Sequence, residues 1–348
     1  MASPTSKSDP LSKNHQRIES VDFLKAFAIF CVVWGHSVQN LNHGSEFWYN
    51  KIFEIIYSFH MPLFFMISGF FFKSSLKQTF WEFIRKKATQ LILPCITWSV
   101  LFMCVRCIQH PENINWEGEF GELLFSIKWS FWFLTELFIS YCLTYIAYKI
   151  LKKDWLVFVC CMAFVLVAPY CGRQRFLFPL FLFGIALKDN YPYIREHLKY
   201  FLWGSLIVFL PCLFFWNGDH TIYRSAFPAI FDIQNLNWNF SNIDISLFRL
   251  LIGLSGSIFF FTLFHQIYKK NNFCSQVSKI GKYTLGIYIL HLSIPGNYIN
   301  SLFDFSNTNI WVFNLLITPL FAAAVVGICI GILLLVRNKL LRTLLFGS

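Results

Sequence analysis

Long apolar segments recur along this chain and constrain its fold more than any single motif does. A helix of about 17 to 25 apolar residues is long enough to cross a lipid bilayer. Ten such segments occur, near residues 22–41, 52–72, 90–109, 130–148, 154–170, 174–188, 199–216, 248–268, 283–299 and 310–336, of which the fifth and sixth are short. With 56% hydrophobic and 14% charged residues among 348, the chain is too apolar for a water-soluble protein of this size. The sequence therefore predicts an all-α, polytopic membrane bundle of about ten transmembrane helices.

The predicted membrane domain occupies residues 21–338. The first twenty residues are polar and lack the apolar core of a signal peptide, so 1–20 is expected to be a cytoplasmic tail that is not cleaved. Residues 339–348 are expected to form a short cytoplasmic tail at the other end. Most of the eleven cysteines lie within apolar runs, where cysteine packs as a small hydrophobe, so no disulfide framework is predicted.

The distribution of Lys and Arg predicts the orientation. Cytoplasmic loops of membrane proteins carry an excess of both residues. If both termini are cytoplasmic, the inner segments hold 21 of the 29 Lys and Arg residues. The other eight are Lys25, within the first span, and on the outer side Lys51, Arg106, Lys128, Arg173, Arg175, Arg224 and Arg249. This topology accounts for the net charge of +11, so the bilayer is the expected partner and no nucleic acid is required.

The first span carries ionisable residues at membrane depth. His36 follows Lys25 by eleven positions, about three helical turns and roughly 16 Å of rise, so the two side chains project from nearly the same face. Asp22, one turn before Lys25, shares that face. Such groups cost at least about 2.5 kcal/mol each near the middle of a membrane helix and usually face a cavity or a partner. Lys25 is near enough to the interface to extend its ammonium toward water, whereas His36 is not.

Other spans place polar residues at a similar depth. In the second span, His60 precedes Pro62, which is expected to kink the helix, and the following Ser68 and Gly69 permit close helix contact. Glu136 lies in the outer half of the fourth span. Arg249 opens the eighth span and His291 lies late in the ninth. Together these residues predict a polar cavity in the outer half of the membrane.

Each of these residues also has a structural interpretation. An isolated membrane histidine is about as often a hydrogen-bond partner between helices as a catalyst, and Glu136 could simply pair with a histidine or with Arg249. For Arg249 and His291, near the ends of their spans, the structural interpretation is favoured. For His36, its shared face with Asp22 and Lys25 and its depth, comparable to that of His60, favour a function.

Five segments, in order, resemble the acyltransferase-3 family of membrane O-acyltransferases: RIESVDFLKAFAIFCVVWGHS, SFHMPLFFMISGFFFK, a basic run leading into QLILP, WFLTELFISY and IGKYTLGIYILH. The resemblance spans nearly the whole chain and implies about ten helices and the transfer of an acyl group, usually acetyl from acetyl-CoA, to hydroxyls of surface sugars. It matches the basic residue and histidine of the family to Lys25 and His36, and its upstream Arg and Asp to Arg17 and Asp22. Members of the family often have two arginines, three positions apart, just before the motif that QLILP matches. At the matching positions this chain has Lys87 and Gln90.

The resemblance also implies roles for these residues. The anionic acetyl-CoA would bind near the basic segment that contains Arg85, Lys86 and Lys87, although the positive-inside rule alone would also produce this segment. His36 would act either as a general base on the acceptor hydroxyl or as a covalent acyl carrier. His60 or Glu136 would orient it or stabilise developing charge.

Several alternatives remain open at this stage. Buried ionisable residues are equally typical of transporters, so an exporter or flippase for a glycan or lipid-linked sugar is the main rival; a structural membrane subunit ranks last. A succinyl or other short acyl group fits the same motifs, and the acceptor sugar and oligomeric state are undetermined. Acetyl-CoA is expected as co-substrate, with no permanently bound cofactor and no metal, in a multi-pass protein of a bacterial inner membrane.

Overall fold

The computed structural model describes residues 18–42, 46–232, 236–293, 305 and 308–347, and this part of the chain is almost entirely helical. Its α-helices are α1 (Glu19–Leu41), α2 (Lys51–Phe70), α3 (Phe80–Lys87), α4 (Leu93–Gln109), α5 (Trp116–Phe125), α6 (Trp132–Leu151), α7 (Asp154–Val167), α8 (Gly172–Asp189), α9 (Tyr191–Glu196), α10 (Leu198–Phe215), α11 (Ile243–Ile267), α12 (Asn272–Ile280), α13 (Thr284–His291), α15 (Ile310–Val312), α16 (Thr318–Leu335) and α17 (Lys339–Phe346).

Short 3₁₀ and π-helical segments connect several of these helices. The 3₁₀ segments are η1 (Glu46–Tyr49), η2 (Phe72–Lys77), η4 (Pro111–Asn113) and η6 (Gly218–His220); the π-helical segments are η3 (Ala88–Ile92), η5 (Ser126–Ser130) and η7 (Phe313–Ile317). The loop between α10 and α11 contains two short antiparallel strands, β1 (Phe231–Asp232) and β2 (Asn237–Trp238), with Phe231 opposite Trp238. The predicted polytopic helical bundle is therefore confirmed.

Seven helical segments of the described chain are long and apolar enough to cross a membrane, so the predicted total of ten is not confirmed. They cover residues 19–41, 51–77, 80–109, 132–151, 198–215, 243–267 and 310–335. The predicted fifth span is the 14-residue helix α7, and the sixth is α8, which carries charged residues at both ends. The ninth is α13, which ends at His291, and much of the rest of that span lies outside the described residues.

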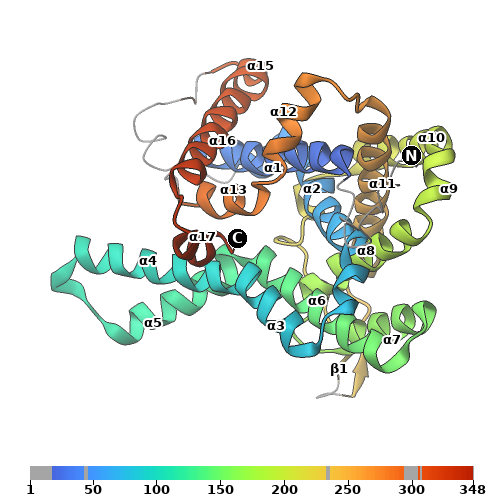
Figure 1. Cartoon of the computed structure of the whole chain (residues 1–348), viewed down its shortest axis with the longest axis horizontal. Coiled ribbons are helices and arrows are strands. Elements are labelled where there is room, and N and C mark those ends of the chain that lie inside the picture. Colours follow the sequence, from blue (N-terminus) through green and yellow to red (C-terminus); the bar gives the residue numbers. More distant parts are fainter. Residues whose placement is uncertain (1–17, 43–45, 233–235, 294–304, 306–307, 348) are drawn as a thin grey trace, which may run out of the picture.

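Helices α1 and α2 occupy the centre of the bundle. Within their most apolar stretches, 72% of the residues are buried, compared with 17% in α10. Helix α1 packs against α2, α11, α12, α13 and α16. In Figure 1, α12 and α16 lie on one side of it and the body of the molecule lies on the other. The indole of Trp34 donates a 2.9 Å hydrogen bond to Thr318 Oγ1 and so ties α1 to α16. The outer helices therefore shield α1 from lipid.

Two glycines allow α2 and α8 to pack with their backbones in contact. A methyl group at Gly69 would overlap the carbonyl of Phe181, and one at Gly184 would overlap the carbonyl of Met66. Such approaches gain dispersion energy, the main attraction between helices that already share an apolar solvent. The close contact predicted at Ser68 and Gly69 is confirmed.

The C-terminal helix α17 packs against α4, α13 and η3. Phe346 is buried, and the indole of Trp98 in α4 donates a 2.9 Å hydrogen bond to the carbonyl of Leu345. Residues 339–346 of the expected tail are thus a packed helix, and the side of the membrane on which they lie stays a prediction. Helices α4 and α5 extend away from the rest of the bundle (Figure 1).

The α2–α8 contact predicts the effect of adding one methyl group. Alanine normally favours a helix over glycine by about 1 kcal/mol, but Gly69→Ala and Gly184→Ala should each destabilise the protein by about 1–3 kcal/mol because the helices must separate. Thermal unfolding of the detergent-solubilised protein measures this loss. The control is Gly327→Ala in α16, where a methyl group would meet nothing within 4 Å; equal stability of all three variants would contradict this packing argument.

Candidate functional site

One face of α1 connects two cavities. Lys25, Ile29 and Val32 line a cavity of about 250 Å³, and His36, one turn further, lines a second cavity of about 320 Å³. We call them the inner and the outer cavity after the predicted orientation of the chain. These four residues follow one another at intervals of three or four positions, which places them on one side of a helix. The shared face predicted for Lys25 and His36 is therefore present in the structure, with apolar residues between the two ionisable ones.

The inner cavity has a basic mouth and apolar walls. Lys25 and Lys282 both line it, and Lys25 lies 3.5 Å from a carboxylate oxygen of Asp22 and over the ring of Phe71. Gly281 brings the α12–α13 turn against α1, because a methyl group there would overlap the carbonyl of Asp22. The walls come from α1, α2, α6, α13 and η3, and include Phe64, Ile67, Leu91, Phe133, Leu134, Leu137 and Leu285.

The predicted donor-binding residues divide into two groups. Arg85 and Lys86 are exposed, whereas Lys87 is partly buried and lies 3.6 Å from the centroid of the Tyr141 ring. The hydroxyl of Tyr141 donates a 3.2 Å hydrogen bond to the carbonyl of Ser68, which lines the inner cavity. Lys87 thus lies close to this cavity, while Arg17 lies outside the described residues.

The outer cavity is lined mainly by aromatic rings. They come from η1, α2, α4, η5, α6, the loop between α10 and α11, and α13: Trp48, Phe53, Tyr57, Phe102, Trp129, Trp132, Tyr223 and Tyr288. The guanidinium of Arg173 lies 4.5 Å from the Trp129 ring centroid and 5.3 Å from that of Trp132. Burial raises the pKa of the Tyr223 phenol in the outer loop, so its hydroxyl stays protonated and able to donate. This lining suits a ligand with both polar groups and apolar faces.

His36 meets a second histidine, His291. The two ring centroids are 5.1 Å apart. His291 Nδ1 lies 3.1 Å from the carbonyl oxygen of Ile287. Because a carbonyl oxygen only accepts, this nitrogen carries the proton and Nε2 is an acceptor in the neutral ring. Within the described chain, His291 Nε2 is buried without a hydrogen-bond partner. The structure therefore adds His291 to the candidate site, although its position near the end of a span favoured a structural role.

His60 faces its own helix. Its Nδ1 donates a 2.6 Å hydrogen bond to the carbonyl of Ile56, and its ring packs against Tyr57 at 4.7 Å between centroids. His60 is 2% exposed and is not among the residues that line the outer cavity. It supports the wall behind Tyr57, and its predicted action on His36 stays a prediction.

Glu136 pairs with α8. One carboxylate oxygen accepts a 2.6 Å hydrogen bond from Gln174 Nε2, and the other lies 3.8 Å from Arg173 Nη1. Ser140 donates in turn to Gln174 Oε1 at 2.9 Å. Within the described chain these are its side-chain partners, so the predicted pairing of Glu136 with a histidine or Arg249 is not what the structure shows. Glu136 reaches the outer cavity only through Arg173.

Arg249 holds the outer loop. This residue is 1% exposed, and its guanidinium donates to the carbonyls of His220, Thr221 and Ser225 at 2.7, 3.2 and 2.9 Å and to Ser225 Oγ at 2.6 Å. These bonds fix the loop segment that contributes Tyr223 to the outer cavity. The structural role favoured for Arg249 from its sequence position is confirmed.

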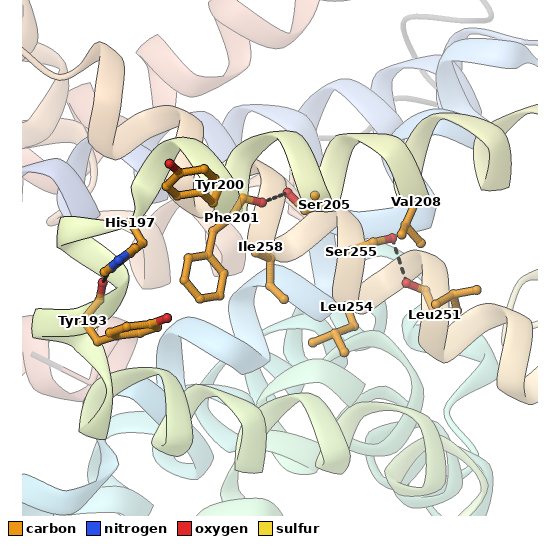
Figure 2. Close-up of a pocket in the computed structure, with 11 residues that line it drawn as sticks. Tyr193, His197, Tyr200, Phe201, Ser205, Val208, Leu251, Leu254, Ser255 and Ile258 are labelled. Atoms are coloured by element: carbon orange, nitrogen blue, oxygen red, sulfur yellow. Dashed lines mark hydrogen bonds between the residues drawn. The ribbon is translucent and has the colours of Figure 1, made fainter.

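Another hollow, of about 510 Å³, is a poor candidate for chemistry. It lies between α10 and α11 and shares no lining residue with the two cavities of α1. Figure 2 shows its polar groups bonded locally: Ser205 to Phe201, Ser255 to Leu251 and His197 to Tyr193. The two serines and His197 are thus engaged with nearby backbone carbonyls, and apart from the Tyr193 and Tyr200 hydroxyls the rest of the lining is apolar.

Comparison with known proteins identifies relatives. The family described as "Acyltransferase domain", acyltransferase-3, matches residues 18–336. The nodulation protein NolL of Sinorhizobium fredii is 27% identical over 221 residues, which cover 59% of each chain. NolL of Mesorhizobium japonicum is 31% identical over 137 residues, 38% of this chain and 36% of the relative. The chain thus aligns with less than two thirds of either relative, and no solved structure matches it.

Removing the hydrogen bonds made by Arg249 should loosen the loop between α10 and α11. Hydrogen bonds to charged groups contribute about 1.5–3 kcal/mol each, so Arg249→Ala should speed chymotrypsin cleavage within residues 217–242 by at least about 10-fold. Arg224→Ala is the control, because Arg224 lies in the same loop but makes an exposed ion pair with Asp219 of small expected energy. Equal cleavage of both variants would contradict the role assigned to Arg249.

Proposed function

The chain belongs to the acyltransferase-3 family. From this membership and from the two cavities of α1, we propose that the protein is a membrane O-acyltransferase. Its substrates in this proposal are cytoplasmic acetyl-CoA and a hydroxyl of a cell-surface or lipid-linked sugar. The observation that carries the proposal is the position of His36, which lines the outer cavity one helical turn beyond the end of the inner one.

The inner cavity fits the donor. Its mouth carries Lys25 and Lys282, and Arg85 and Lys86 are exposed on α3, so the anionic phosphates of CoA would meet several cations. The apolar walls would enclose the thiol-bearing arm and keep water from the thioester. The acetyl group would then approach His36 along the face that contains Ile29 and Val32.

The outer cavity fits the acceptor. Aromatic rings such as those of Trp48, Trp129 and Trp132 offer flat apolar surfaces on which the C–H face of a pyranose can stack. Arg173 and the Tyr223 hydroxyl supply donors for sugar oxygens. The matched relatives are named nodulation proteins and come from rhizobia, which supports a bacterial origin, and the proposal places the protein in the inner membrane.

The chemistry requires a base near the acceptor hydroxyl. Neutral His36 removes the hydroxyl proton as the oxygen attacks the thioester carbonyl; the C–S bond then breaks, and the CoA thiolate leaves and takes up the proton. In the covalent route, an imidazole nitrogen of His36 attacks first, carries the acyl group after CoA leaves, and passes it to the hydroxyl. The His291 ring, whose Nε2 is buried without a hydrogen-bond partner in the described chain, lies beside His36 with its centroid 5.1 Å away.

Release of free CoA tests this function. The full-length protein in detergent is given acetyl-CoA with and without a crude surface-polysaccharide fraction. Acceptor-dependent release is expected, and His36→Ala should lower its rate at least about 100-fold because general base catalysis supplies 10²–10⁴-fold.

The matched control is His197→Ala, which removes a histidine from the hollow between α10 and α11 and should leave the rate unchanged. Substantial release by a folded His36→Ala variant would overturn the role of His36. No release by folded wild-type protein that also fails to bind acetyl-CoA would instead favour the transport hypothesis.

A further inference from the structure

Two side chains separate the cavities of α1. Among the described residues, Met61 of α2 and Tyr288 of α13 line both the inner and the outer cavity, and no other residue lines both. Met61 is 8% exposed and Tyr288 is 5% exposed, so both are enclosed by protein. An acyl group that moves from the inner cavity to an acceptor in the outer one must therefore pass these two side chains.

Met61 and Tyr288 together form a partition between the two cavities, and they differ in rigidity. The Tyr288 ring packs between Phe133 and His291, with centroid distances of 5.2 and 5.6 Å. Met61 ends in a flexible, unbranched thioether that fills irregular space and changes rotamer readily. Tyr288 is thus a fixed wall, whereas Met61 is the part that can yield to a small group.

The surroundings of the partition are apolar. On the inner side, Val32, Phe64 and Phe133 line the cavity, and the lysines lie at its mouth. Lys25 precedes His36 by three helical turns, roughly 16 Å. A longer alkyl chain on the donor would collide with Met61 here.

We propose that Met61 limits the length of the acyl group and, with the apolar walls around it, selects acetyl over longer alkyl donors. This proposal rests on the acyltransferase function proposed above and names its donor specificity. Because one methylene in an apolar pocket changes selectivity about 10-fold or more, the wild type should prefer acetyl over butyryl by at least about 100-fold.

A competition experiment tests the proposal independently of how much protein folds. The full-length protein receives equal concentrations of acetyl-, propionyl-, butyryl- and succinyl-CoA with the crude polysaccharide fraction, and mass spectrometry measures the ratio of acyl esters released by alkali. Met61→Ala removes Cγ, Sδ and Cε, which separate the two cavities, and should lower the preference for acetyl over butyryl at least about 10-fold.

Met66→Ala is the matched control. It makes the same change one and a half turns further along α2, where Met66 is 1% exposed and lines neither cavity of α1; its product ratio should equal that of the wild type. If Met61→Ala does not fold, Met61→Val is measured instead, since it also shortens the side chain.

Three results would overturn the assignment of Met61: an unchanged ratio in an active Met61 variant, an equal shift in Met66→Ala, or loss of transfer from every donor in a folded Met61 variant. Failure of the underlying function would be distinct, because the wild type would then transfer no acyl group at all.

Discussion

Helix α1 is enclosed by other helices and still carries Asp22, Lys25 and His36, and this conflict governs how the rest of the chain packs around it. Ionisable side chains at membrane depth are stable only beside partners or in cavities. The surrounding helices provide both: a basic mouth at the Lys25 end and an aromatic cavity at the His36 end. The apolar residues Ile29 and Val32 between them keep the two polar regions apart.

The buried polar groups of the bundle divide according to whether the backbone satisfies them. The guanidinium of Arg249 donates hydrogen bonds to carbonyls of the loop, and His60 donates one to the preceding turn of its own helix. These residues hold elements in place. Lys25, His36 and Arg173 line cavities, and His291 keeps one nitrogen without a partner in the described chain. The residues of this second group lie in or beside the two cavities of α1.

Periodicity within one helix was enough to predict part of this site. The eleven-residue interval placed Lys25 and His36 on one face, and the small residues Ser68 and Gly69 indicated a close helix contact; both features are present. Contacts between helices were harder to predict. Glu136 pairs with Gln174 and Arg173 of α8, a helix whose charged ends weakened its hydrophobic signal.

The parts that sequence reasoning missed depend on helix crossings. His291 reaches His36 because α13 packs against α1, and Met61 and Tyr288 form a partition because α2 and α13 each contribute one side chain to both cavities. The spacing of residues within one helix does not determine which residues of other helices they contact. The number of spans was also uncertain, since hydropathy does not distinguish short helices such as α7 from complete crossings.

The central claim is that two cavities on opposite sides of the membrane meet beside His36, and cysteine accessibility tests it most directly. In a background without native cysteines, Lys282→Cys at the inner mouth and Gln39→Cys in the outer cavity are exposed to a membrane-impermeant maleimide in inside-out and right-side-out vesicles. The Lys282→Cys variant should react only from the cytoplasmic side, with protection by acetyl-CoA, and the Gln39→Cys variant only from the outer side. Reaction of both variants from the same side would contradict the account.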